Sequence, residues 1–409
     1  MRTFSNLTFA FALATASAAA CDSNGTGNTN TNTDMSTPDG AEPADMSSPG
    51  VPRTIQFTAS GEELAGGGYS FPAAAADDPV LVDGWEVRFD ELLVTFANIS
   101  LSESPDKSAT DQSQTDAKVA QANGPWAVDL HKGGLVTGKD GIANEAVEIT
   151  TLTNQNLKGN IQFDTTKRYA FGYDVVPAAT GAQNVNMDTQ GKSDYQVMVQ
   201  NKWTVLYVGT ATFKGTACTS TVPAYDYTKL PKVVKFRIGL ASPTSYVNCQ
   251  NPENNPAAPI GNDEYQRGIQ LKDNATTIAQ LTLRTERLFW ESFALGSAAH
   301  FDQLAALAKK DASNNFVVTE QELKGVNFTA FKDAAASPLP WRSCVATYPL
   351  PTGSTTVSFD TQGIPYNPTG NPAQVMRDYL DYATYTQSAQ GILNDDGLCF
   401  VKRGYVSPP

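Results

Sequence analysis

The feature that most constrains the fold is a long succession of short segments with strand periodicity, separated by turn-forming residues. Residues 54–58 and 85–89 alternate polar and apolar side chains, as half-buried strands do. Further candidate strands lie at 92–101, 126–130, 146–151, 169–176, 195–200, 204–213, 233–240 and 278–285. This pattern is typical of a β-sandwich or barrel, and we expect a mainly β protein with an antiparallel β-sandwich over residues 54–286.

The character of the chain changes after residue 286. Residues 287–409 are rich in Pro and Gly and predict a smaller helical and irregular C-terminal segment. Helices are expected from His300 onward, over 320–324 and around 372–384, where apolar side chains recur at helical spacing. Within the β region, the acidic stretch 102–123 predicts a solvated loop or an inserted hairpin.

The charge balance excludes one class of partner. The 409 residues contain 29 Lys and Arg against 42 Asp and Glu, which gives a formal net charge of −13. Because phosphate binding needs clustered Lys and Arg, we expect no nucleic-acid partner. His131 and His300 are the only histidines, so a site built on several imidazoles is impossible.

The first twenty residues have the pattern of a secretory signal peptide. Arg2 provides the positive charge, residues 7–17 form a short apolar segment, and Ala18–Ala20 are the small residues before a cleavage site. Cys21 follows directly and resembles the lipobox cysteine of bacterial lipoproteins. The resemblance implies that Cys21 is lipidated and anchors the protein to a lipid bilayer of the bacterial cell envelope, in the periplasm or at the cell surface. Ordinary secretory cleavage before Cys21 is the alternative.

The segment after the cysteine predicts a flexible tether over residues 21–53. It is rich in Asn, Thr, Gly, Ser, Asp and Pro and has almost no aliphatic side chains. Such a segment cannot bury enough apolar area to offset the entropy of ordering it. A tether between a lipid anchor and a folded body is the layout expected of an envelope lipoprotein.

Four cysteines remain after Cys21: Cys218, Cys249, Cys344 and Cys399. In an exported chain, an even number predicts disulfides, and four cysteines permit three connectivities. Proximity in the sequence favours Cys218–Cys249 and Cys344–Cys399. A zinc site is the alternative, but no C-x-x-C spacing occurs and neither histidine is close to a cysteine in the sequence.

Two short motifs suggest a family for the β region. The run Trp126-Ala-Val-Asp-Leu-His-Lys-Gly-Gly is followed later by Arg168-Tyr-Ala-Phe-Gly-Tyr. Together they are similar to a β-sandwich domain of bacterial lipoproteins of unassigned function. The resemblance covers about residues 54–240 and implies the fold, but no activity.

One motif has chemical content. Residues 311–322 resemble the twelve-residue EF-hand loop, which binds calcium through oxygen ligands. The resemblance implies these ligands: Asp311, Ser313, Asn315, the Val317 carbonyl, Thr319 and Glu322. Phe316 replaces the usual glycine and the set contains two carboxylates, so we expect calcium to be a weakly bound, structural cofactor. Alternatively, Thr319-x-x-Glu322 is a helix capping box and Asp311 only forms a turn.

No motif predicts a catalytic reaction. The chain has no G-x-S-x-G, H-E-x-x-H, P-loop or G-x-G-x-x-G sequence. We therefore expect a non-catalytic envelope protein with a structural role or an unknown protein or glycan ligand. The first alternative is copper or zinc binding by His300 with Asp302, Glu286 or Glu291. The second is a carbohydrate-active hydrolase with paired carboxylates. Exposed aromatic side chains can stack on sugars, but the five tryptophans are predicted to lie in the core.

Overall fold

The structure is a computed structural model that describes residues 53–76, 78–254 and 264–409. The predicted signal peptide, Cys21 and all but the last residue of the tether lie outside the described residues. Within the described ranges the protein is mainly β, with two large sheets and a few helices, which confirms the predicted sandwich-like fold class. No helix in these ranges is both long and apolar enough to cross a membrane.

The elements are short apart from β2. The strands are β1 (Thr54–Ser60), β2 (Trp85–Ser102), β3 (Lys118–Ala122), β4 (Trp126–Asp129), β5 (Val147–Leu152), β6 (Arg168–Val175), β7 (Gln183–Asn184), β8 (Val205–Phe213), β9 (Thr219–Ser220), β10 (Val233–Leu240), β11 (Thr244–Val247), β12 (Ile269–Gln270), β13 (Thr276–Leu283), β14 (Lys309–Lys310), β15 (Phe316–Thr319), β16 (Arg342–Ser343), β17 (Gly391–Leu393), β18 (Gly397–Leu398) and β19 (Phe400–Arg403). The helices are α1 (Glu62–Gly67), α2 (Thr189–Asn201), η1 (Tyr227–Lys229), η2 (Glu286–Phe289), α3 (Asp302–Leu307), α4 (Glu320–Leu323) and α5 (Tyr379–Gln387).

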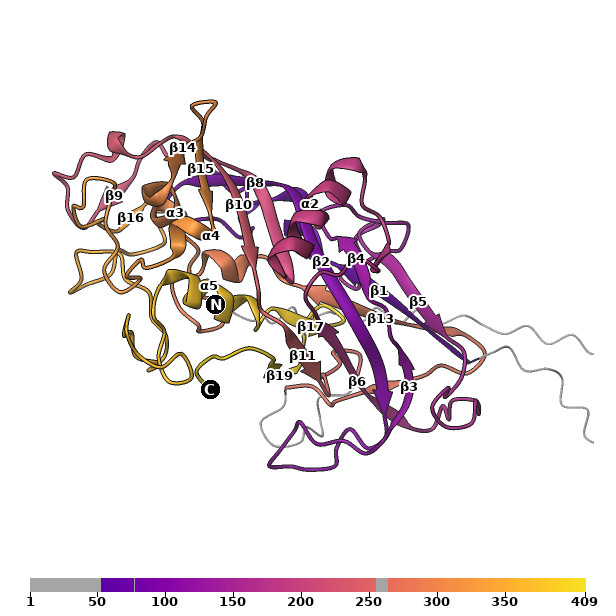
Figure 1. Ribbon diagram of the computed structural model, residues 1–409. Helices are drawn as coiled ribbons and strands as arrows, with labels where there is room; N and C mark the ends of the chain where they lie inside the picture. Colours follow the sequence, from indigo (N-terminus) through magenta and orange to yellow (C-terminus); the bar gives the residue numbers. More distant parts are fainter. Residues whose placement is uncertain (1–52, 77, 255–263) are drawn as a thin grey trace, which may run out of the picture. The chain divides into compact units, whose positions relative to one another are not determined.

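In the described residues, the smaller sheet has the order β18-β17-β13-β1-β5 and the larger one β14-β15-β10-β8-β2-β6-β11-β19 (Figure 1). The larger sheet also includes β3, β4, β7 and β12. Most neighbours are antiparallel, as predicted. The pairs β1–β13, β10–β15 and β4–β7 are parallel, so the sandwich is mixed.

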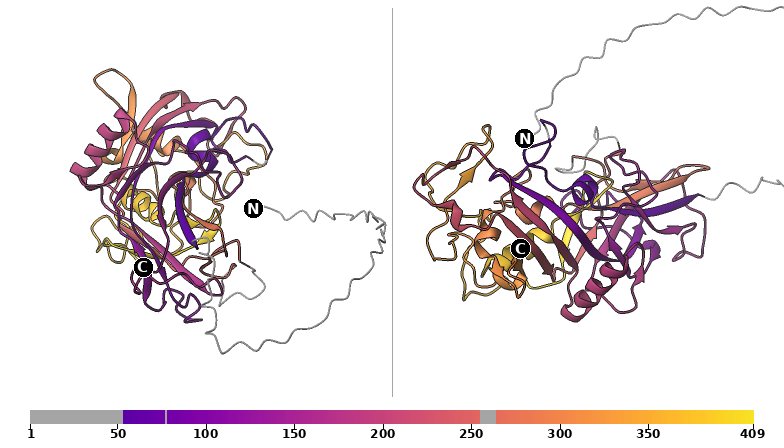
Figure 2. Two further views of the ribbon diagram at one scale, coloured as in Figure 1. Left: turned by 90° about the vertical axis from the view of Figure 1, so that its right-hand side faces the viewer. Right: turned by 90° about the horizontal axis from the view of Figure 1, so that it is seen from above.

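The alternation of side chains explains the layers. In β8, Val205 and Tyr207 are buried in the main core, whereas Leu206 points to the opposite face of the sheet and contacts a second cluster with Tyr195 and Met198 of α2. Figure 2 shows α2 on the outer side of the strands. The two sheets meet on the inner side, where Phe57 of β1 and Phe171 of β6 stack with ring centroids 5.9 Å apart.

Most predicted strands are confirmed within one or two residues, and 233–240 coincides with β10. Two predicted strands, 85–89 and 92–101, form the single long strand β2, and part of the 102–123 stretch forms the hairpin strand β3. The predicted strand at 195–200 is wrong, because these residues are in helix α2. The Asp188 side chain caps this helix by accepting a hydrogen bond from the Gly191 backbone N–H.

The segment after residue 286 contributes strands to both sheets. β17 pairs with β13, β15 with β10, and β19 with β11. The three predicted helices are present as α3, α4 and α5, although α5 begins at Tyr379, later than expected. Its start is set by Asp378, whose carboxylate accepts a hydrogen bond from the Asp381 N–H.

The predicted disulfides form, but the connectivity favoured by proximity is wrong. The bonds are Cys218–Cys344 and Cys249–Cys399, across 126 and 150 residues. Strand pairing explains both. Antiparallel pairing of β9 with β16 aligns the residues next to Cys218 and Cys344. The β11–β19 pair ends at Val247 and Phe400, within two residues of Cys249 and Cys399. The cysteine partners are therefore set by the pairing of distant strands and not by the distance between the cysteines along the sequence.

Candidate functional site

The EF-hand-like residues form a β-hairpin followed by a helix. Asp311 lies at the turn between β14 and β15, and its carboxylate accepts hydrogen bonds from the backbone N–H groups of Ser313 (2.8 Å) and Asn315 (2.9 Å). Val317 lies within β15, in register with Lys235 of β10. The predicted ligands are therefore spread along a turn and an extended strand.

The last two predicted ligands form the capping box of α4. The Glu322 carboxylate accepts hydrogen bonds from the Thr319 N–H (3.0 Å) and hydroxyl (2.7 Å), and Thr319 accepts one from the Gln321 N–H. Glu322 also pairs with Lys309 at 3.4 Å. In the described ranges, no group of three or more His, Cys, Asp or Glu side chains is arranged to hold a metal ion. Calcium binding by this loop stays a prediction.

The His300 region is a buried ion network. His300 Nε2 lies 2.8 Å from Glu291 Oε2, and Nδ1 lies 4.0 Å from Asp83 Oδ2. Asp83 accepts hydrogen bonds from the backbone N–H groups of Phe301 and Asp302, both at 2.7 Å. His300 is 3 % exposed and Asp83 fully buried, so the network has little access to a ligand.

The remaining acids of the first alternative have other partners. Asp302 pairs with the Arg342 guanidinium and accepts a hydrogen bond from Trp85 Nε1 at 2.7 Å. Glu286 lies 3.8 Å from Arg284, in a different cluster. Of the residues proposed as copper or zinc ligands, the fold brings Asp302 and Glu291 close to His300, but ion pairs and hydrogen bonds occupy both. The network is suited to joining distant segments.

Burial and neighbouring charges shift the ionisation of this network. Burial raises the pKa of Asp83 to about 7, and the Asp302 charge adds to the rise. Burial lowers the pKa of His300, but the carboxylates of Glu291 and Asp83 outweigh this effect, so the pKa is raised. Asp83 and His300 therefore both keep their protons to a higher pH in the folded protein than in the unfolded chain.

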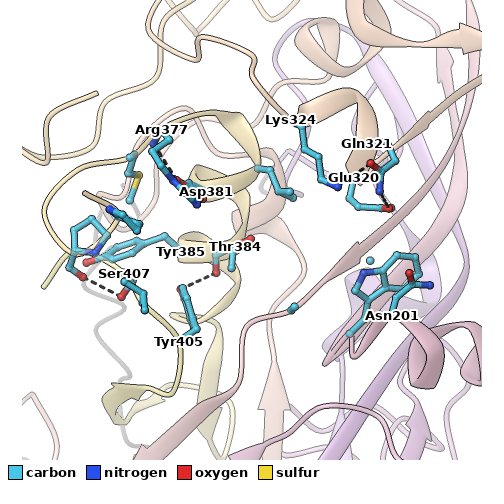
Figure 3. Close-up of a pocket in the computed structure, with 18 residues that line it drawn as sticks. Asn201, Glu320, Gln321, Lys324, Arg377, Asp381, Thr384, Tyr385, Tyr405 and Ser407 are labelled. Carbon is cyan, nitrogen blue, oxygen red and sulfur yellow. Dashed lines mark hydrogen bonds and ion pairs between the residues drawn. The ribbon is translucent and has the colours of Figure 1, made fainter. Parts of the chain in front are cut away.

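A pocket with a volume of about 390 Å³ lies elsewhere, on the outer side of β10 (Figure 3). One wall comes from the end of α2 and from β10, and the other from α4, α5 and residues 405–408. In Figure 3, Asn201 lies on one side and Arg377 and Asp381 on the other. The segments that line this pocket are up to 207 residues apart in the sequence, from Asn201 to Pro408, so no local motif indicates the pocket.

Trp203 provides the aromatic wall of this pocket. The preceding residue, Lys202, has a left-handed backbone (φ 58°) that ends α2, and the Trp203 N–H donates to the Met198 carbonyl at 3.0 Å. The indole covers Gly239 of β10, where a Cβ atom would lie only 2.0 Å from Trp203 Cδ2. Trp203 is half-buried, whereas the other four tryptophans are buried. Trp203 still packs against the second cluster, which includes Tyr195 and Met198, so at this position the prediction that all five tryptophans lie in the core holds only in part.

The opposite wall offers planar polar groups. Arg377 donates two hydrogen bonds to Asp381, at 2.8 and 2.9 Å. Gln321 links Glu320 to Lys324, through hydrogen bonds of 2.6 and 2.7 Å. An apolar ring facing amide, carboxylate and guanidinium groups suits a ligand with both apolar and hydroxyl-bearing faces. Comparisons of the chain with known protein families, curated proteins and solved structures give no significant match.

Proposed function

We propose that this protein is an exported, lipid-anchored envelope protein that binds a glycan in the Trp203 pocket without catalysing a reaction. The signal-like N-terminus and Cys21 support export and anchoring. The two disulfides support folding in an oxidising compartment.

The position of Trp203 carries the glycan proposal. One face of a hexose ring presents C–H groups that pack on an aromatic ring, while its hydroxyls need hydrogen-bonding partners. Trp203 lies flat against Gly239, and the polar groups of α4 and α5 face the same pocket. The carboxylates of this pocket are held in place, Asp381 by Arg377 and Glu320 by Gln321, so they offer oriented acceptors for the hydroxyls of a sugar.

Titration with neutral oligosaccharides tests the binding proposal. We expect tryptophan fluorescence to change on addition of a tetrasaccharide of glucose, and Trp203→Ala to weaken binding at least tenfold in calorimetry at a temperature where the variant is folded. The variant should also unfold at a lower denaturant concentration, because Trp203 packs against the second cluster. Trp126→Phe is the matched control, because Trp126 is buried in the core. Unchanged affinity in Trp203→Ala would refute the pocket assignment. Release of reducing ends would refute the non-catalytic role and favour the hydrolase.

Mass spectrometry of the mature protein tests the anchor. We expect an N-terminal Cys21 with a diacylglyceryl group, and a Cys21→Ser variant that is released from membranes. An intact leader would contradict export, and a mature N-terminus at an unmodified Cys21 would contradict lipidation.

Calorimetry tests the EF-hand-like loop. If calcium binds there as a weak structural cofactor, millimolar calcium should give a heat signal and raise the melting temperature, and Asp311→Ala should abolish both. Asp226→Ala is a control, because Asp226 forms a comparable turn outside this loop. If calcium gives neither a heat signal nor a higher melting temperature, the calcium proposal is refuted and residues 311–322 are a β-hairpin followed by a capped helix.

A further inference from the structure

A second pocket, of about 290 Å³, lies beside the first. Its walls include Arg287 of η2, Trp290 and Phe293 after it, Thr361, and Tyr385 of α5. Tyr385 also lines the Trp203 pocket, so this one side chain borders both spaces. The volume of the second pocket lies just below the range of typical small-molecule sites, about 300–1,000 Å³, and suits a ligand the size of one sugar.

Arg287 is the unusual group in this pocket. Its side chain is only 9 % exposed, yet within the described residues its guanidinium has no hydrogen bond and no ion pair within 4 Å. The adjacent acid, Glu286, lies nearest to another cation, Arg284, at 3.8 Å. The contact found for the Arg287 guanidinium is the Trp290 ring, whose centroid lies 5.1 Å from Cζ.

Arg287 Nε is shielded from solvent and has no hydrogen-bond partner, and such an unpaired buried group is costly because the protein does not replace the water it loses. Burial accordingly lowers the pKa of Arg287. Arg342 shows how this protein otherwise treats a buried arginine: it is 6 % exposed and pairs with Asp302. Arg287 lacks such a partner and borders a pocket, where a bound anion would supply one.

We propose that the second pocket binds the carboxylate of an acidic sugar through Arg287. A guanidinium matches a carboxylate with two parallel hydrogen bonds, and among the described lining residues Arg287 has the only charged side chain. The backbone carboxyl of Pro409 also borders the pocket, but it forms no ion pair with Arg287 within 4 Å. The pocket also offers uncharged polar side chains, Ser292, Thr361 and Gln362, beside the Trp290 ring. The polar side chains could bind the hydroxyl groups of a hexuronate, and the Trp290 ring could pack against its C–H face. The sugar part of the inference rests on the glycan-binding function proposed above, but the anion site does not.

Titration of the full-length protein with sodium glucuronate tests this site, with glucose and acetate as reference probes. We expect glucuronate to raise the melting temperature and to shift the Nε–Hε NMR signal of Arg287, while glucose leaves that signal unchanged. Acetate should bind at least tenfold more weakly than glucuronate. No shift of the Arg287 signal at millimolar glucuronate would overturn the proposal, and equal binding of acetate would overturn its sugar part.

Variants separate the two pockets. Arg287→Met should lose at least tenfold in glucuronate affinity without a drop in melting temperature, because it removes an unpaired buried charge and keeps the apolar stem. Arg287→Lys should bind glucuronate with intermediate affinity. Trp203→Ala should keep glucuronate binding. If Arg287→Met binds glucuronate normally, the anion-site proposal fails, whereas the glycan proposal for the Trp203 pocket stands. If Trp203→Ala binds the neutral tetrasaccharide normally while Arg287→Met loses glucuronate, only the assignment of a glycan to the Trp203 pocket is refuted.

Discussion

At the scale of single residues, Gly239 decides where Trp203 can lie. Glycine weakens a strand, and a close approach of another group is a common reason for one inside it. Here the indole occupies the space that any other side chain would need. The alternation of side chains in β10 predicts the strand, but it does not predict the contact with the indole, because Trp203 follows the end of α2 and is distant from Gly239 in the sequence.

Replacing this glycine tests the contact. Gly239→Ala should displace the indole, destabilise the protein by about 1–3 kcal/mol through overpacking, and weaken binding in the Trp203 pocket. Denaturant unfolding and tryptophan fluorescence measure both effects. Gly181→Ala is the matched control, because nothing lies within 4 Å of the added methyl group. An equal effect of the two substitutions would show that Trp203 does not rest on Gly239.

At the scale of elements, helix capping could be predicted where the cap and the capped residue are close in the sequence. The spacing of Thr319 and Glu322 predicts a capping box as the alternative to a calcium-binding loop, and the structure forms this capping box. The sequence pattern does not predict the helix at 189–201, because Tyr195–Gln200 alternates like a strand and the capping residue Asp188 lies seven residues before this segment. A short alternating segment therefore does not distinguish a strand from a helix until the residues that could cap its ends are considered.

The N-cap of α5 provides a test at this scale. Asp378 accepts hydrogen bonds from Asp381 N–H and from Gly325 N–H, both at 2.9 Å, so it joins the start of α5 to the end of α4. Asp378→Ala should lower the free energy of unfolding by roughly 1–2 kcal/mol. Asp378→Asn keeps an accepting oxygen and should cost less. Equal stability of the alanine variant and the parent would contradict the role of this cap.

Strand pairing also predicts what each disulfide does. The Cys249–Cys399 bond closes a long loop beside the β11–β19 pair. In the chain-entropy model, replacing both cysteines by serine should cost about 4–5 kcal/mol, seen as a lower denaturant midpoint. Non-reducing peptide mapping checks the pairing directly, and a peptide that links Cys218 to Cys249 would contradict the fold.

At the scale of the whole molecule, four buried or half-buried carboxyl groups set the response of stability to pH. Burial is the main cause that raises the pKa of Glu62 to about 9, of Glu91 to about 8, and of Asp83 and Glu145 to about 7. In the unfolded chain these groups titrate near pH 4. Between about pH 4 and pH 9, the folded protein therefore keeps protons on these carboxyl groups that the unfolded chain has already released.

The sign of the pH dependence follows. Stability that depends on these protons is present below about pH 4 and is lost as the pH rises towards about 7–9, so the melting temperature should fall between pH 5 and pH 9. The raised pKa of His300 acts in the same direction. Glu91→Gln should flatten the profile, because it stays neutral beside Asp194. A melting temperature that rises over this range would contradict the prediction.

The sequence by itself determined the fold class, most strand positions, the capping box and the number of disulfide cysteines, because each depends on side chains that are close together along the chain. Only the tertiary structure decided the disulfide partners, the neighbours of His300, the Trp203 pocket and the isolation of Arg287. These features join segments more than 100 residues apart in several cases, and sheet pairing brings such segments together without leaving a spacing in the sequence.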